Sequence, residues 1–199
     1  SISPGLFQQQ MNHLSEHFPI KKFTDVGVHE NAIAVTFDDG FADNLDIASP
    51  VLVDLNIPFT IFVTSNNIGA NSMYLSANGL RELSNVPGAL IGAHGVSHRS
   101  LTGCNNSELY DELINSKKII EDIIGKNVKT MSYPHGSVNQ QVRETVSIAG
   151  YELSASSRFG NNLNNFDPLK IDRTDIWSND DLLVFQSKLN GEWDWLRYF

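Results

Sequence analysis

Short apolar runs alternate with longer amphipathic segments along nearly the whole chain, and this alternation limits the fold more than any other feature. The apolar runs have strand length, and the longer segments carry apolar residues at helical spacing. Strands that alternate with helices form a parallel sheet with helices packed outside it, so the sequence predicts an α/β fold. We expect strands at residues 32–37, 59–64, 89–93, 128–133, 151–155 and 169–173, helices at 4–18, 42–55, 107–124 and 137–149, and a loop at 161–165.

Several helices carry local signals for where they begin, bend or end. The segment 107–124 is apolar along one side, so its charged residues are expected to face outward. Gly125 is expected to end this helix. Pro50 falls inside the second helix and should kink or restart it. Ser137 and Gln140 have the spacing of a capping box, which predicts the start of the last of these helices.

Polar residues follow three of the expected strands at the point where each strand ends. Asp38 and Asp39 follow the first strand, His94 follows the third, and the segment 134–136 (Pro-His-Gly) follows the fourth. In sheets of parallel strands, ligands bind at the carboxyl ends of the strands. We therefore expect these residues to lie at one end of the sheet.

The residue types in these segments are those of a metal site. Asp38 and Asp39 are adjacent, and like charges raise each other's pKa unless a positive charge or hydrogen bonds hold them. A metal ion would resolve that conflict. His94 and His98 are four residues apart, and neutral imidazoles are good zinc ligands. If the segments meet in space, the chain is a metal-dependent hydrolase.

Each motif also has a reading without chemistry. An Asp-Gly pair such as Asp39-Gly40 is often a hairpin turn, although here a helical pattern follows rather than a second strand. A pair of histidines is often surface or core packing, and the segment 133–136 by itself signals only a turn. Without convergence of the three, the chain is an ordinary α/β domain with a polar loop.

Composition narrows the classes of function. With 199 residues, we expect a single catalytic domain spanning 1–199 that lacks an N-terminal segment. The net charge of -9 argues against nucleic acid or an anionic membrane as the main partner. No apolar run has the length of a membrane span. Cys104 is the single cysteine, which excludes an internal disulfide. The chain opens with no signal-peptide pattern, and its compartment is left open.

The motifs resemble those of a known family. Residues 36–40 (Thr-Phe-Asp-Asp-Gly) match the first motif of the NodB-homology polysaccharide deacetylases, carbohydrate esterase family 4. His94 and His98 match the second motif, with Gly95 where Ser or Thr is usual. The segment 134–136 matches the third, Pro-Tyr-Gly, with a histidine at the tyrosine. The similarity covers nearly the whole chain.

This resemblance implies a deformed, incomplete (β/α) barrel and a hydrolase that removes N-acetyl groups from amino-sugar glycans, with bacterial cell-envelope polysaccharide as the expected pathway. It implies a divalent metal, usually Zn²⁺, with Co²⁺ or Ni²⁺ as alternatives. Asp39, His94 and His98 correspond to the metal ligands, and Asp38 to the general base. The family pattern places a backbone N–H of the oxyanion site at His135. Substrate or oxyanion contacts are expected from Tyr133, Pro134, His135, Arg173 and Trp177.

Two further motifs depart from the family pattern. The family often has an arginine that orients the catalytic aspartate, and here Ser132 stands at that position. Arg173, in the last strand, is predicted to reach the same region; the alternative is a surface arginine. The segment 172–177 loosely resembles the fourth motif, so Trp177 is expected either to line the acetyl pocket or to pack in the core.

The general acid is the least complete part of the expected site. No histidine follows His135 in this chain. The exopolysaccharide-type subgroup carries this histidine ahead of a Ser-Pro-x-x-Phe helix, which residues 3–7 resemble, so we expect the acid upstream of Ser1. His135 is a second candidate. The remaining histidines, His13, His17 and His29, are expected to be surface residues.

Two other functions stay open. One is a catalytically weak relative that binds metal or carbohydrate, because its general acid and motif arginine are absent. The other is an amide hydrolase that acts on a small or lipid-linked sugar. An open groove would fit a polymer and a closed pocket a small ligand. Intact Asp38 favours an enzyme, since a binding protein needs no base. The oligomeric state is not predicted.

Overall fold

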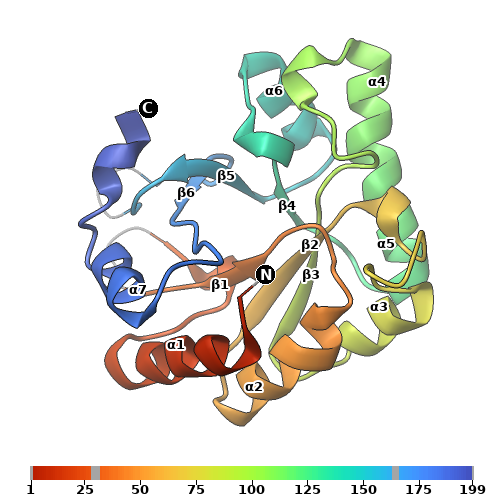
Figure 1. Cartoon of the computed structure of the whole chain (residues 1–199). Coiled ribbons are helices and arrows are strands. Elements are labelled where there is room, and N and C mark those ends of the chain that lie inside the picture. Colours follow the sequence, from red (N-terminus) through yellow and green to blue (C-terminus); the bar gives the residue numbers. More distant parts are fainter. Residues whose placement is uncertain (1, 28–31, 163–165, 199) are drawn as a thin grey trace.

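The chain folds around one parallel sheet, seen in a computed structural model that describes residues 2–27, 32–162 and 166–198 (Figure 1). The strands follow one another across the sheet in chain order, and every neighbouring pair is parallel. They are β1 (Val35–Phe37), β2 (Phe59–Val63), β3 (Ala89–Ala93), β4 (Thr130–Ser132), β5 (Leu153–Phe159) and β6 (Ile171–Arg173).

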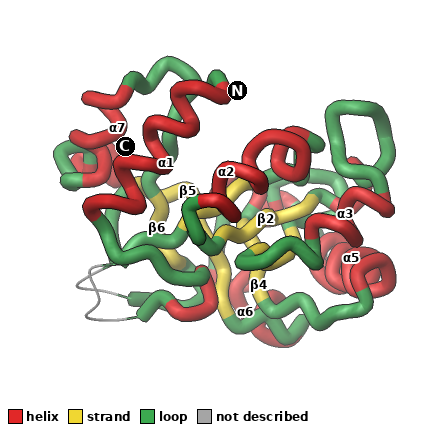
Figure 2. The backbone as a smooth tube through the Cα atoms, turned by 90° about the horizontal axis from the view of Figure 1, so that it is seen from below, coloured by secondary structure: helices red, strands yellow, loops and turns green. Residues whose placement is uncertain are grey.

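Helices cover the outside of the curled sheet, as Figure 2 shows in a second view. They are α1 (Pro4–His17), α2 (Ser49–Asp54), α3 (Ala77–Leu83), α4 (Asn106–Tyr110), α5 (Ser116–Ile124), α6 (Gln140–Ile148) and α7 (Leu182–Leu189). Two π-helical turns, Asn44–Ala48 and Asp111–Asn115, lead into α2 and α5. Within the described ranges, no helix combines the length and apolar character that crossing a membrane requires.

The sheet is an incomplete barrel because its first and last strands stand at opposite edges of the strand order. A cavity of about 530 Å³ lies between β1 and β6, and residues of α1 and α7 help to line it. These two helices pack against each other beside the opening (Figure 1). The expectation of a deformed, incomplete (β/α) barrel is confirmed.

The core explains why the central strands read as continuous apolar runs. Every residue of β2 is buried, since parallel strands in the middle of such a sheet are covered on both faces. Gly92 of β3 lies opposite Phe62 of β2 in the register, and a Cβ at Gly92 would stand 2.5 Å from the Phe62 ring. The β2–β3 contact therefore needs glycine at this position.

The expected elements are present, with differences at their ends. The first strand begins at Val35 rather than at residue 32, and the fifth runs from Leu153 to Phe159 rather than over 151–155. The helix after Pro50 restarts as expected, with the proline in the first turn of α2. The short helices α3 and α7 were not predicted. Part of the expected 161–165 loop lies outside the described residues.

Two helix predictions were wrong. The capping box at Ser137 does not form, because α6 begins only at Gln140, and Ser137 follows the 3-10 turn Pro134–Gly136. Instead, Asn139 caps α6 by accepting a hydrogen bond from the N–H of Val142. The helix expected at 107–124 is present, but its charges do not all face outward, since Glu112 in the π-helical turn is only 6 % exposed.

Candidate active site

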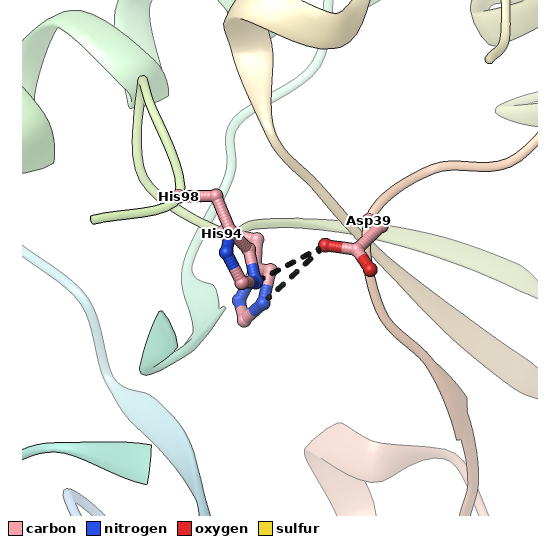
Figure 3. Close-up of side chains that lie close together, drawn as sticks. All are labelled: Asp39, His94 and His98. Atoms are coloured by element: carbon pink, nitrogen blue, oxygen red, sulfur yellow. Dashed lines mark ion pairs between the residues drawn. The ribbon is translucent and has the colours of Figure 1, made fainter. Parts of the chain in front are cut away.

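The three motifs meet at the carboxyl ends of β1, β3 and β4. Asp39, His94 and His98 each offer a ligand atom, and these atoms lie within 4.8 Å of one another (Figure 3). The Asp39 carboxylate is 3.8 Å from His94 Nε2 and 3.3 Å from His98 Nε2. The sheet topology has thus brought together residues far apart in sequence, as expected from the positions of the motifs after their strands.

The surroundings of His94 fix its tautomer so that the lone pair of Nε2 faces Asp39. The ring is buried, and its Nδ1 lies 2.8 Å from the carbonyl oxygen of Ser132. Because a carbonyl only accepts, Nδ1–H must donate, which leaves Nε2 unprotonated in the neutral ring. Burial lowers the pKa of His94, although the Asp38 carboxylate opposes this shift. A neutral ring with its second nitrogen held by a carbonyl is the usual arrangement of a metal-ligating histidine.

The site also concentrates backbone strain. Asp39, His98 and His135 have φ angles of 72°, 58° and 58°, in the left-handed region that non-glycine residues rarely adopt. Such conformations cost free energy and persist where the surrounding structure holds them, typically at functional sites. One strained residue follows each of the three motif strands.

The donor set fits a divalent metal ion. One carboxylate and two imidazoles are ligands that zinc accepts, and three protein ligands leave coordination positions open for water and substrate. The fit rests on the convergence of Asp39, His94 and His98 and on the tautomer that Ser132 imposes on His94. The alternative reading of the motifs as unrelated loop residues does not agree with this geometry.

Asp38 points to a different partner from Asp39. Arg173 donates two hydrogen bonds to its carboxylate, each 2.8 Å long, and Ser132 Oγ donates a third of 3.1 Å. Burial alone would raise the pKa of Asp38, but the charge and hydrogen bonds of Arg173 hold that pKa below its ordinary value. Asp38 therefore stays ionised beside the candidate metal ligands, with Oδ2 at 3.9 Å from His94 Nε2.

Arg173 reaches this position from the far edge of the sheet. It belongs to β6, and its Nε donates to the carbonyl oxygen of Ser156 on β5. One guanidinium nitrogen also lies 2.9 Å from Ser132 Oγ. Ser132, where the family pattern has arginine, thus bridges Asp38 and Arg173. The structure places Arg173 where the prediction put it and not on the surface, since its side chain is 13 % exposed.

The third motif supplies the wall next to His98. The His135 ring packs edge-on against His98 with ring centroids 4.6 Å apart, and its Nε2 lies 3.1 Å from the His98 carbonyl oxygen. Pro134, the residue before His135, is buried. Gly136 has a φ of 65°, and a Cβ there would stand 2.7 Å from the backbone nitrogen of Ser157. The turn is therefore held tightly against β5.

Two of the predicted substrate residues have their described contacts elsewhere. The Tyr133 side chain is fully buried, and its hydroxyl donates to the carbonyl oxygen of Leu169. Burial raises the pKa of Tyr133 to about 12. Trp177 is 42 % exposed and contacts Trp193, with the Lys188 ammonium 3.6 Å from its ring centroid. A pocket role for Trp177 stays a prediction.

The other histidines lie outside the site or outside the described residues. His13 and His17 are on α1, where their rings stack at 4.2 Å. His17 is exposed and His13 is half-buried against α7. His29 lies outside the described residues.

Glu112, which contacts the loop between His94 and His98, was not identified from the sequence. Its place three positions after the inward Leu109 was a signal that it faces inward.

Comparison with known proteins gives the family. The protein-family model described as polysaccharide deacetylase matches residues 25–154 of this chain. The chain is 28 % identical over 131 residues to the putative polysaccharide deacetylase YxkH of Bacillus subtilis, covering 66 % of this chain and 46 % of that protein. It is 31 % identical over 120 residues to the peptidoglycan-N-acetylglucosamine deacetylase PgdA of Listeria monocytogenes, covering 58 % and 24 %. The chain thus spans less than half the length of these relatives.

Solved structures agree with the fold. The putative polysaccharide deacetylase BA0330 of Bacillus anthracis superposes with a TM-score of 0.83 at 26 % identity, covering 94 % of this chain and 62 % of that one. IcaB of Ammonifex degensii has the same fold, with a TM-score of 0.82 at 18 % identity and coverage of 99 % and 90 %. The family match includes all three motifs but ends before Arg173. The chain belongs to the polysaccharide deacetylase family.

Proposed function

We propose that the chain is a metal-dependent hydrolase that removes N-acetyl groups from amino-sugar glycans. The observation that carries this proposal is the ionised Asp38, held by Arg173 immediately beside the convergent Asp39, His94 and His98. Membership of the family supports it. A relative named for its action on peptidoglycan supports a glycan of the bacterial cell envelope as the substrate.

Each residue of the site has a proposed role. Asp39, His94 and His98 would hold the metal, most simply Zn²⁺, with Co²⁺ or Ni²⁺ as alternatives. When bound, such an ion lowers the pKa of water and polarises a carbonyl oxygen. Asp38 accepts the proton of the attacking water as general base, and Arg173 keeps its carboxylate ionised and oriented. The His135 backbone N–H donates to the oxyanion of the tetrahedral intermediate.

The leaving amine must take up a proton when the C–N bond breaks. Among the described residues, the His135 ring lies next to the proposed ligands, and its Nε2 is engaged with the His98 carbonyl oxygen. Because that contact uses the proton on Nε2, the ring would have to carry a second proton on Nδ1 and pass this second proton to the amine. We propose His135 as the donor among the described residues.

Replacing Asp38 tests the proposal directly. Asp38→Asn should lower acetate release from N-acetylglucosamine oligomers by about 10²- to 10⁴-fold, because the general base is lost. The variant should still bind zinc, since Asp38 is outside the proposed ligand set. Acetate release and bound metal would be measured with and without added zinc.

Asp46→Asn is the matched control, because Asp46 is an exposed carboxylate in the following π-helical turn. It should behave as the wild type. Wild-type protein that holds no divalent metal after zinc addition would contradict the proposal, and so would full activity in Asp38→Asn.

The same assay separates the alternatives. A catalytically weak relative would bind zinc or oligomer without releasing acetate, whereas the Arg173–Asp38 pair favours turnover because a binding protein needs no oriented base. A hydrolase of small or lipid-linked sugars would prefer the monosaccharide or lipid-linked substrate over longer oligomers. A rate that rises with oligomer length would support the polymer.

A further inference from the structure

Glu112 lies where a carboxylate is not expected. It is 6 % exposed, although the helical pattern of 107–124 was expected to keep charges in solvent. It belongs to the π-helical turn Asp111–Asn115 between α4 and α5. Such turns interrupt an α-helix with one wider turn and are frequent at functional sites. The buried carboxylate points at the loop that joins His94 to His98.

This carboxylate makes three hydrogen bonds to the loop. Oε2 accepts from the backbone N–H of Val96 at 2.7 Å and of Ser97 at 3.0 Å. Oε1 accepts from the Ser97 hydroxyl at 2.5 Å. Hydrogen bonds to an ionised acceptor are stronger than neutral ones, and here three donors share one carboxylate. The two residues that Glu112 holds are the ones immediately before His98.

Neighbouring groups hold the rest of the loop. Ser116, four residues after Glu112, donates to the Gly95 carbonyl oxygen at 2.9 Å. On the opposite side, the N–H of Ser65 donates to the same carbonyl and the N–H of Asn66 donates to that of Val96. The loop is therefore fixed between the π-helical turn and the segment after β2.

Gly95 has no side chain, so the hydrogen bonds that hold the loop at this position come from residues outside it. Its φ is 74°, and a Cβ there would stand 3.0 Å from Glu112 Oε2. Position 95 thus has no side chain that could hold the loop. His98 also has a left-handed backbone, so the loop includes strain that other contacts must offset.

We propose that Glu112 is a positioning residue for the metal site: it fixes residues 96–97 so that His98 is held at the correct place relative to His94 before metal binds. The inference rests on the proposed metal-binding function of this site. Residues that orient metal ligands without touching the metal typically change metal affinity by 10- to 100-fold when they are replaced.

The experiment compares Glu112→Gln with Asp111→Asn. The control removes the same charge from the same turn, but Asp111 is exposed and accepts only from the Asn115 side chain among its described hydrogen bonds. Zinc affinity would be measured by calorimetry. Hydrogen exchange of the peptide containing residues 94–98 would be measured in metal-free protein. Glu112→Gln should bind zinc at least about tenfold more weakly than the wild type, and the amide hydrogens of residues 94–98 should exchange faster. Asp111→Asn should match the wild type in both measurements.

Ser97→Ala is a milder second variant if Glu112→Gln does not fold, since it removes only the bond to Oε1. It should weaken zinc binding in the same direction but less. Equal zinc affinity and loop exchange in wild type and Glu112→Gln would overturn the inference, as would a lower melting temperature without either change. If the wild type binds no zinc, the proposed metal-dependent function is contradicted. Faster exchange of residues 94–98 in metal-free Glu112→Gln would then still show that Glu112 holds the loop, so failure of the function and failure of this inference can be told apart.

Discussion

At the scale of single residues, the adjacent carboxylates Asp38 and Asp39 have different partners and different proposed roles. Asp39 has a left-handed backbone, with a φ of 72°. Asp39 faces the histidines, whereas Asp38 accepts two hydrogen bonds from Arg173 and one from Ser132. The electrostatic conflict expected of two neighbouring carboxylates is therefore relieved for Asp38 by a guanidinium.

Replacing Arg173 should move the pH dependence of activity. In the wild type, the pKa of Asp38 lies below its ordinary value, so the proposed base is ionised across the neutral range. In Arg173→Gln, burial would raise that pKa without the opposing charge, and the base would take up a proton at higher pH. The acid limb of kcat/KM should therefore shift to higher pH.

Arg158→Gln is the control for this shift, because Arg158 pairs with Asp172 at 3.6 Å and has an exposed side chain. Its profile should match the wild type. An unchanged acid limb in Arg173→Gln would show that the guanidinium does not set the ionisation of Asp38.

At the scale of elements, the close contact between β2 and β3 sets where His94 stands. His94 follows β3 directly, and its N–H donates to the carbonyl oxygen of Val63 at the end of β2. Gly92, two residues earlier, lets β3 approach the Phe62 ring. The packing of one pair of strands is thus coupled to the position of a proposed metal ligand.

Gly92→Ala should destabilise the fold through this contact. Its Cβ would stand 2.5 Å from Phe62 and 2.8 Å from Thr130 Oγ1, so both side chains must shift. Overpacking of this kind costs about 1–3 kcal/mol. The free energy of unfolding would be measured by urea titration of the metal-free protein.

Gly103→Ala is the matched control, since no atom lies within 4 Å of a Cβ built there. Its stability should stay close to that of the wild type. Equal stability of the two variants would mean that the β2–β3 contact accommodates a methyl group without strain.

At the scale of the whole molecule, the proposed metal site joins parts of the barrel that are distant in sequence. Asp39 follows β1, at one edge of the strand order, and His94 and His98 follow β3. A ligand that binds only the folded chain stabilises it, by about 2.7 kcal/mol at a free concentration near 100 times Kd. For a chain of this size, that corresponds to a rise in Tm of about 5–10 °C.

Zinc should therefore raise the melting temperature of the wild type, and a chelator should reverse the rise. His94→Ala and His98→Ala should melt at the same temperature with and without zinc, because each loses one of three ligands. His17→Ala, which removes an exposed histidine on α1, should keep the full response. A zinc response that survives in both ligand variants would place the metal elsewhere.

Much of the fold and half of the site could be predicted from sequence because their signals are local. Apolar runs, helical spacing and the residues directly after each strand predicted the parallel sheet and the convergence of Asp39, His94 and His98. One error was also local: Asn139 rather than Ser137 caps α6, because the helix begins at Gln140.

The sequence by itself determined the α/β class and the residue types of the proposed metal site. Both follow from short segments: the periodicity of strands and helices, and the motifs that come directly after the strands. Only the tertiary structure decided which partners complete the site. Arg173 binds Asp38 across the opening between β6 and β1. Glu112, in a π-helical turn, binds the loop that joins His94 to His98. The Arg173–Asp38 contact depends on the curl of the sheet, and the contact of Glu112 with the loop depends on helix packing. Both therefore arise only when segments distant in sequence fold against each other.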